Sequence, residues 1–146
     1  MGCKPTVLYV EDDPMLRDLI AEVLVGNGFV CIPAANGADA LRLIDSQLHS
    51  FDTLLSDVRM PGAVTGFDVA DRFEAAYPRS EVVLVPGHLA PEDAAMAHRE
   101  RRQVFTKPVR IADLLRILTD AAKRAAARQP ADLKIVPLNS GKGGRN

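Results

Sequence analysis

Residues 52–62 of the chain read Asp52-Thr-Leu-Leu-Ser-Asp57-Val-Arg-Met-Pro-Gly62. A short apolar run leads directly into one carboxylate, Asp57, and the Pro61-Gly62 pair then makes the chain turn. In α/β proteins an acid at the end of a buried strand lies where ligands bind. The stretch therefore predicts a sheet strand with a candidate functional group at its carboxyl end.

The rest of the chain alternates short apolar runs with helical patterns. The runs predict strands at residues 7–10, 29–32, 53–56, 81–85 and 104–105. Apolar stripes predict helices from Pro14, from about Gly37, around Phe67, from Pro91 and from Ile111 to about Arg128. Leu19 and Ala122 are among the residues expected to face inward. This alternation implies a doubly wound parallel sheet of five strands and five helices.

Length and composition limit the classes of function. A chain of 146 residues is expected to form one domain, and a net charge of −1 gives no electrostatic reason to expect nucleic acid or membrane binding. We find no signal peptide pattern and no apolar stretch of about 20 residues. Cys3 and Cys31 are too few for a disulfide framework. These observations favour a cytoplasmic protein with reduced thiols.

Three carboxylates and one lysine follow apolar runs that would lie in one sheet. Glu11 and Asp12 follow the first run, Asp57 follows the third, and Lys107 follows the fifth. Carboxylates that share a small space repel one another unless a cation neutralises them, and hard oxygen ligands favour Mg²⁺. A carboxylate nucleophile, a divalent cation and an ammonium group together suit phosphoryl transfer.

Each of these residues also has a simpler explanation. Glu11 and Asp12 could cap the first helix, Asp57 could be a turn residue, and Lys107 could be a solvated loop lysine. Their joint occurrence on strands of one sheet favours the functional interpretation.

The same residues resemble a known family. Val-Glu-Asp-Asp-Pro at 10–14, Ser-Asp-Val-Arg-Met-Pro-Gly at 56–62 and Thr-Lys-Pro at 106–108 resemble the receiver domain of two-component response regulators, with the resemblance covering residues 5–128. It implies a flavodoxin-like five-stranded parallel sheet of order 2-1-3-4-5 with five helices. We accordingly expect a receiver domain at residues 1–128 and a C-terminal tail at residues 129–146.

The resemblance also implies roles for individual residues. Asp57 would accept a phosphoryl group from a histidine kinase, and Lys107 would bridge Asp57 and that group, with a cis bond to Pro108. Such a domain is a phosphoacceptor, with at most self-directed phosphotransfer and autodephosphorylation, and is not expected to be an enzyme. The implied Mg²⁺ ligands are Asp12, Asp57, the backbone carbonyl of Arg59 and, through a water molecule, Glu11.

One position departs from the family pattern. Receivers usually carry Ser or Thr at the end of the fourth strand, and this chain has Pro86, followed by Gly87 and His88. Proline offers neither a hydroxyl nor an N–H, although the Gly87 amide could still donate to phosphate. The usual aromatic switch residue is replaced by Val104. We expect phosphorylation to persist but to signal by another route, or with weak coupling.

Two functions follow from this pattern. The first is a stand-alone receiver, served by a sensor histidine kinase or a histidine phosphotransfer protein in a two-component pathway or phosphorelay, with its output through protein–protein interaction. The alternative is a phosphorylation-independent interaction module, which Pro86 favours. An aspartate-nucleophile phosphatase would need a second acid where Arg59 stands, and a flavin carrier would not place Glu11 and Asp12 in its phosphate loop.

The tail raises a question of assembly. Apolar residues at Leu133, Ile135, Val136 and Leu138 lie beyond a complete fold, and we expect either a dimerisation arm there or a homodimer through the fourth and fifth helices. An arm that folds back on its own domain, or that is disordered, is the alternative.

Overall fold

The computed structural model describes residues 4–99 and 101–128. Its strands are β1 (Thr6–Val10), β2 (Val30–Ala34), β3 (Thr53–Ser56), β4 (Glu81–Leu84) and β5 (Arg102–Val104). Its helices are α1 (Pro14–Gly26), α2 (Gly37–Ser46), α3 (Gly66–Ala76), the 3₁₀ turn η1 (Pro91–Asp93), α4 (Ala94–Ala97) and α5 (Ile111–Ala127). Cys3 and the predicted arm in residues 129–146 lie outside the described residues.

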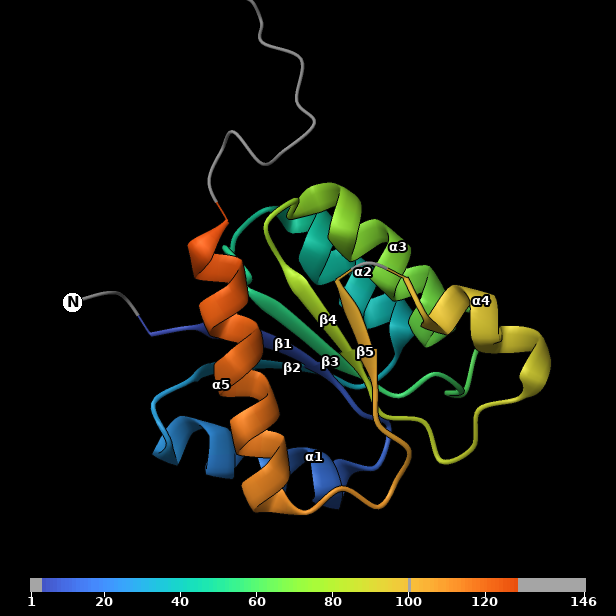
Figure 1. Cartoon of the computed structure of the whole chain (residues 1–146), viewed down its shortest axis with the longest axis horizontal. Coiled ribbons are helices and arrows are strands. Elements are labelled where there is room, and N and C mark those ends of the chain that lie inside the picture. Colours follow the sequence, from blue (N-terminus) through green and yellow to red (C-terminus); the bar gives the residue numbers. More distant parts are fainter. Residues whose placement is uncertain (1–3, 100, 129–146) are drawn as a thin grey trace, which may run out of the picture.

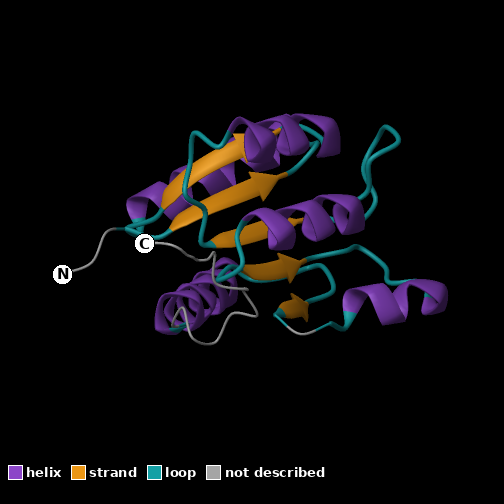
Figure 2. Cartoon of the chain, turned by 90° about the horizontal axis from the view of Figure 1, so that it is seen from above, coloured by secondary structure: helices purple, strands orange, loops and turns teal. Residues whose placement is uncertain are grey.

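The five strands form one parallel sheet in the order β2-β1-β3-β4-β5, which confirms the expected topology. Helices α1 and α5 cover one face of this sheet, and α2, α3 and α4 lie on the other (Figure 1, Figure 2). Strands covered on both faces must be apolar along their length, which explains why the central runs do not alternate with polar residues.

Each face of the sheet has its own apolar core. On the α2–α3 face the core centres on Phe73, which is fully buried and packs its ring against Phe51 and Tyr77. On the other face Leu24 of α1 and Leu118 of α5 are fully buried. The two cores hold the strands in a fixed register, and this register positions the residues that follow each strand.

Polar side chains fix where the helices begin. Asp13 caps α1 by accepting from the N–H groups of Met15 and Leu16, and Asn36 caps α2 through the N–H of Asp39. These caps satisfy N–H groups that have no partner within the helix. Because Asp13 is the capping residue of α1, helix capping does not explain the presence of the acids Glu11 and Asp12.

Several sequence predictions were wrong in detail. The second strand begins and ends later than residues 29–32, and the fifth spans Arg102–Val104, so that Phe105 lies beyond it. Leu19, expected to face inward, is half exposed. Ala122 is only partly buried, while Ala121 is fully buried, because the α5 stripe is rotated slightly from the predicted one.

Within residues 4–99 and 101–128, no helix is both long and apolar enough to cross a membrane.

Candidate functional site

The register of the sheet aligns the carboxyl ends of its strands. Val10 of β1 pairs with Ser56 of β3, which in turn pairs with Leu84 of β4. The residues that follow, Glu11 and Asp57, therefore leave the sheet at the same level and at adjacent strands. Two segments separated by more than forty residues in the sequence meet at this edge.

Asp57 is held by contacts from three directions. Its Oδ1 accepts a 2.6 Å hydrogen bond from the N–H of Val58, and its Oδ2 accepts a 2.9 Å bond from Nζ of Lys107. Its backbone carbonyl accepts from the Ser56 hydroxyl at 2.7 Å. The carboxylate is only partly buried, so that it is fixed in orientation but still reachable from solvent.

Lys107 reaches Asp57 from β5, which is not a neighbour of β3 in the sheet. The lysine extends past the end of β4, and its N–H donates a 2.8 Å bond to the carbonyl of Pro86. The Lys107-Pro108 peptide bond is cis, as the resemblance implied. Burial lowers the pKa of Lys107, but the hydrogen bond and charge of Asp57, with a contribution from Glu11, outweigh it and raise the pKa. The ammonium group therefore stays charged beside the carboxylate.

Glu11 is the buried acid of the site. Its carboxylate accepts from the N–H of Asp13 at 3.2 Å and lies 3.8 Å from Nζ of Lys107. Burial raises the pKa of Glu11, and repulsion from Asp12 and Asp57 adds to the shift. Asp12 is exposed. The site therefore carries more negative charge than Lys107 alone balances.

The donor chemistry of this edge suits a divalent cation. Among the described residues, no group of three or more His, Cys, Asp or Glu side chains is arranged to hold a metal ion. Mg²⁺ rarely requires such a cage, since it keeps several waters and binds through one or two carboxylates. Burial is the main cause of the raised pKa of Glu11, and repulsion from Asp12 and Asp57 adds to it, so that a nearby cation would favour the charged carboxylates. The oxygen ligands present therefore fit Mg²⁺.

The structure also shows two site residues that the sequence did not single out. A Cβ added to Gly66 would lie 2.1 Å from the backbone carbonyl oxygen of Asp57, so only glycine fits against this part of the backbone. Tyr9 lines a cavity of about 280 Å³ beside Asp57 and Lys107. The apolar walls of this cavity come mainly from Tyr9, Leu16, Ile20, Leu55, Val109 and Leu114. Helix-face patterns place such residues in the core but do not reveal that they surround an acid.

The β4–α4 segment lies at the other side of the site. Pro86 is buried, while Gly87 and His88 are exposed. Arg59, two residues beyond Asp57, is exposed and pairs its guanidinium with the carboxylate of Asp93 at the end of η1. This ion pair links the loop that carries Asp57 to the segment that follows β4.

The fold defines the class of protein, a flavodoxin-like α/β domain with five parallel strands. The family model for the response regulator receiver domain matches residues 7–119. The chain belongs to this family of two-component response regulator receivers.

Relatives differ in their total length. The DNA-binding transcriptional regulator NtrC of Escherichia coli (strain K12) is 31% identical over 94 residues, which cover 64% of this chain and 19% of that protein. The chain therefore spans about a fifth of the length of this relative. A 14.6 kDa protein of Leptolyngbya boryana is 32% identical over 116 residues, covering 77% of this chain and 86% of that protein.

Solved structures share the fold. The CheY-like receiver domain protein of Methanospirillum hungatei JF-1 superimposes with a TM-score of 0.76 at 21% identity, covering 84% of this chain and 97% of that chain. At this level of identity the likeness concerns the fold alone.

Proposed function

We propose that the chain is a stand-alone receiver that accepts a phosphoryl group on Asp57. The observation that carries the proposal is the position of Lys107, whose Nζ lies 2.9 Å from Oδ2 of Asp57 although fifty residues separate them. A lysine held beside a solvent-accessible carboxylate suits an acceptor that must bind a highly charged group. The stand-alone character is supported by the small relative from Leptolyngbya boryana, of which this chain covers 86%.

The reaction assigns a step to each of these groups. The Asp57 carboxylate attacks phosphorus, and a new oxygen–phosphorus bond forms as the phosphorus–nitrogen bond to a donor histidine breaks. The electron pair leaves with the imidazole nitrogen, which takes up a proton from solvent. Lys107 binds the transferred group and offsets its charge, and the N–H of Val58 keeps the carboxylate oriented.

Asp12, Asp57 and the backbone carbonyl of Arg59 would hold Mg²⁺, with Glu11 acting through a water molecule. When bound, this cation would supply neutralisation of negative charge on the phosphoryl oxygens. Glu11 is buried close to Lys107, so its contribution is to hold a water molecule and the lysine in place.

The partner that donates phosphate would be a sensor histidine kinase or a histidine phosphotransfer protein in the cytoplasm, and the output would be a contact with another protein. The tail arm beyond Arg128 and the α4–α5 surface remain the predicted dimer contacts. Comparing the solution mass of the full chain with that of a chain ending at Arg128 separates the two contacts, because only the arm is lost on truncation.

The experiment that tests the acceptor role is labelling with acetyl phosphate and Mg²⁺, followed by intact-mass measurement. We expect one phosphoryl group on the wild type and none on Asp57→Asn, whose amide preserves the shape of the side chain. Labelling that persists in Asp57→Asn would place the nucleophile elsewhere.

Pro86 favours a second candidate, an interaction module that works without phosphorylation. That function predicts that Asp57→Asn binds the downstream partner as the wild type does, with or without acetyl phosphate. A loss of phosphate-dependent binding in Asp57→Asn would exclude it.

A further inference from the structure

Two different arginines contact the segment between β4 and β5 that η1 and α4 form. Arg59 pairs with Asp93, the last residue of η1. Arg102 donates a 2.6 Å hydrogen bond to the carbonyl of Met96 in α4. The segment of seven residues, Pro91 to Ala97, therefore has one guanidinium contact on η1 and another on α4.

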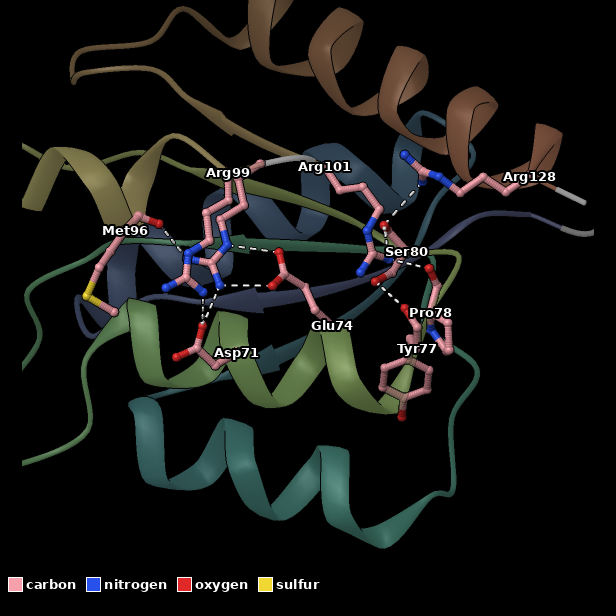
Figure 3. Close-up of polar contacts among 10 residues, drawn as sticks. Asp71, Glu74, Tyr77, Pro78, Ser80, Met96, Arg99, Arg101 and Arg128 are labelled. Carbon is pink, nitrogen blue, oxygen red and sulfur yellow. Dashed lines mark hydrogen bonds and ion pairs between the residues drawn. The ribbon is translucent and has the colours of Figure 1, made fainter. Parts of the chain in front are cut away.

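The Arg102 contact is buried and has many partners. The Arg102 side chain is 0% exposed and also donates to both carboxylate oxygens of Glu74, at 2.8 and 2.9 Å, and to Asp71 at 2.6 Å. Figure 3 shows Asp71 and Glu74 rising from α3 toward the same point as the carbonyl of Met96. A buried, bidentate arginine of this kind cannot leave without exposing unpaired charge.

The Arg59 contact is simpler. The Arg59 side chain is 61% exposed and forms an ion pair with Asp93, whose side chain is 13% exposed. Because the Arg59 guanidinium lies largely in water and has fewer bonds to break than that of Arg102, a more highly charged partner displaces it more readily. The two contacts therefore differ in how readily they can be released.

Phosphorylation of Asp57 would bring such a partner within reach of Arg59. The Cα atoms of residues 57 and 59 lie at most about 7.6 Å apart, since consecutive Cα atoms are about 3.8 Å apart. In the unmodified chain the two Asp57 oxygens already accept from Val58 and Lys107. A phosphoryl group adds three acceptor oxygens and about two negative charges, and guanidinium binds such groups well.

We propose that Arg59 is a ligand of the phosphoryl group on Asp57, and that it leaves Asp93 to bind this group. The exchange, which rests on the proposed function of Asp57, frees the η1 end of the segment while Arg102 continues to hold the α4 end. It supplies a route from phosphate to the α4 surface that does not need the hydroxyl missing at Pro86.

The test uses the full chain with Mg²⁺ and beryllofluoride as the probe, and measures affinity and amide hydrogen exchange at residues 91–97. In the wild type we expect the probe to raise exchange in this segment several-fold. Arg59→Gln should show raised exchange without the probe, no further rise with it, and affinity for the probe weakened roughly tenfold.

Asp93→Asn separates this proposal from a merely structural ion pair. It should also raise exchange without the probe, but it should bind beryllofluoride more tightly than the wild type, because Arg59 is already free. Arg72→Gln is the matched control, since Arg72 is about as exposed as Arg59 and forms an ion pair with Asp45 between α3 and α2. Arg72→Gln should change neither the amide exchange at residues 91–97 nor the affinity for beryllofluoride.

Two results would overturn the inference while leaving the acceptor role intact. One is wild-type affinity for beryllofluoride in Arg59→Gln, and the other is unchanged exchange at residues 91–97 in a wild type that has bound the probe. A wild type that binds no beryllofluoride at all would instead overturn the proposed function, and with it the ligand role of Arg59.

Discussion

The carbonyl of Pro86 accepts a 2.8 Å hydrogen bond from the N–H of Lys107. Proline at this position therefore keeps the backbone acceptor that ties the end of β4 to the loop after β5, and this contact does not involve the side chain of residue 86. The substitution removes a possible donor to phosphate but leaves the placement of Lys107 unchanged. Binding of the phosphoryl group and coupling of that event to β4 can thus be separated.

Restoring a hydroxyl at this position should strengthen phosphoryl binding. Pro86→Thr retains the carbonyl and adds a donor, and one hydrogen bond to the bound group should tighten beryllofluoride binding roughly 2- to 10-fold. Fluorine NMR titration measures this affinity. Pro86→Ala is the control, because it removes the ring without adding a hydroxyl. Equal affinities in the two variants would show that a side chain at residue 86 does not reach the phosphoryl group.

Filling the space behind Asp57 should disrupt the site. Gly66→Ala would place a methyl group 2.1 Å from the Asp57 carbonyl, and we expect a loss of about 2–3 kcal/mol in the free energy of unfolding together with slower phosphorylation. Gly26→Ala is the matched control, since Gly26 also lies at a helix end and a Cβ there meets nothing within 4 Å. Denaturant unfolding of both variants measures the two free energies of unfolding. A Gly66→Ala protein as stable as Gly26→Ala would contradict the close approach.

Neutralising the buried acid should stabilise the metal-free protein. The pKa of Glu11 is raised in the folded state, so between its ordinary value of 4.5 and the raised value the folded chain binds more protons than the unfolded chain. The contribution of Glu11 to the free energy of unfolding therefore falls as pH rises through that window. Glu11→Gln should be more stable than the wild type at neutral pH in a chelator, and the two should converge below pH 4.5. Addition of Mg²⁺ should reduce the difference. A less stable Glu11→Gln at neutral pH would show that the Glu11 charge is favourable in the fold.

The buried arginine of β5 should matter far more than its exposed neighbour. Arg102 and Arg99 both pair with Asp71, but only Arg102 of the two is fully buried and also holds Glu74. Arg102→Met leaves Glu74 without its cation and Asp71 with Arg99 alone, and it should lower the free energy of unfolding by about 3–5 kcal/mol. Arg99→Met should cost less than about 1 kcal/mol. Denaturant midpoints of the two variants test this, and similar losses would contradict the assigned burial.

Local sequence signals predicted most of the architecture because the central strands β1, β3 and β4 are buried along nearly their whole length. The apolar run before Asp57 and the cap at Asp13 depend on neighbours in the chain, so their pattern is visible without the fold. The short β5 strand was misplaced because it begins with Arg102, a charged residue that the strand can bury only through acids on α3. An ion pair between residues more than twenty-five positions apart leaves no periodic signal in the sequence.

The site was predictable to the same extent. Acids after strands are visible in the sequence, and the resemblance supplied the pairing of Lys107 with Asp57. The requirement for glycine at residue 66 and the Arg59–Asp93 pair depend on how separate loops approach one another, and neither has a local pattern. Tyr9 was read as part of an apolar strand, and its place beside the carboxylates follows only from the packing of α1 and α5.

The side chain of Asp57 should become an acyl phosphate, and borohydride trapping detects this product at a single residue. Reduction converts an aspartyl phosphate into homoserine, which peptide mass spectrometry locates in the chain. After treatment with acetyl phosphate and Mg²⁺, we expect homoserine at residue 57 and unmodified Glu11, Asp12 and Asp13. Homoserine at one of those three positions, or a phosphorylated chain with intact Asp57, would contradict the account.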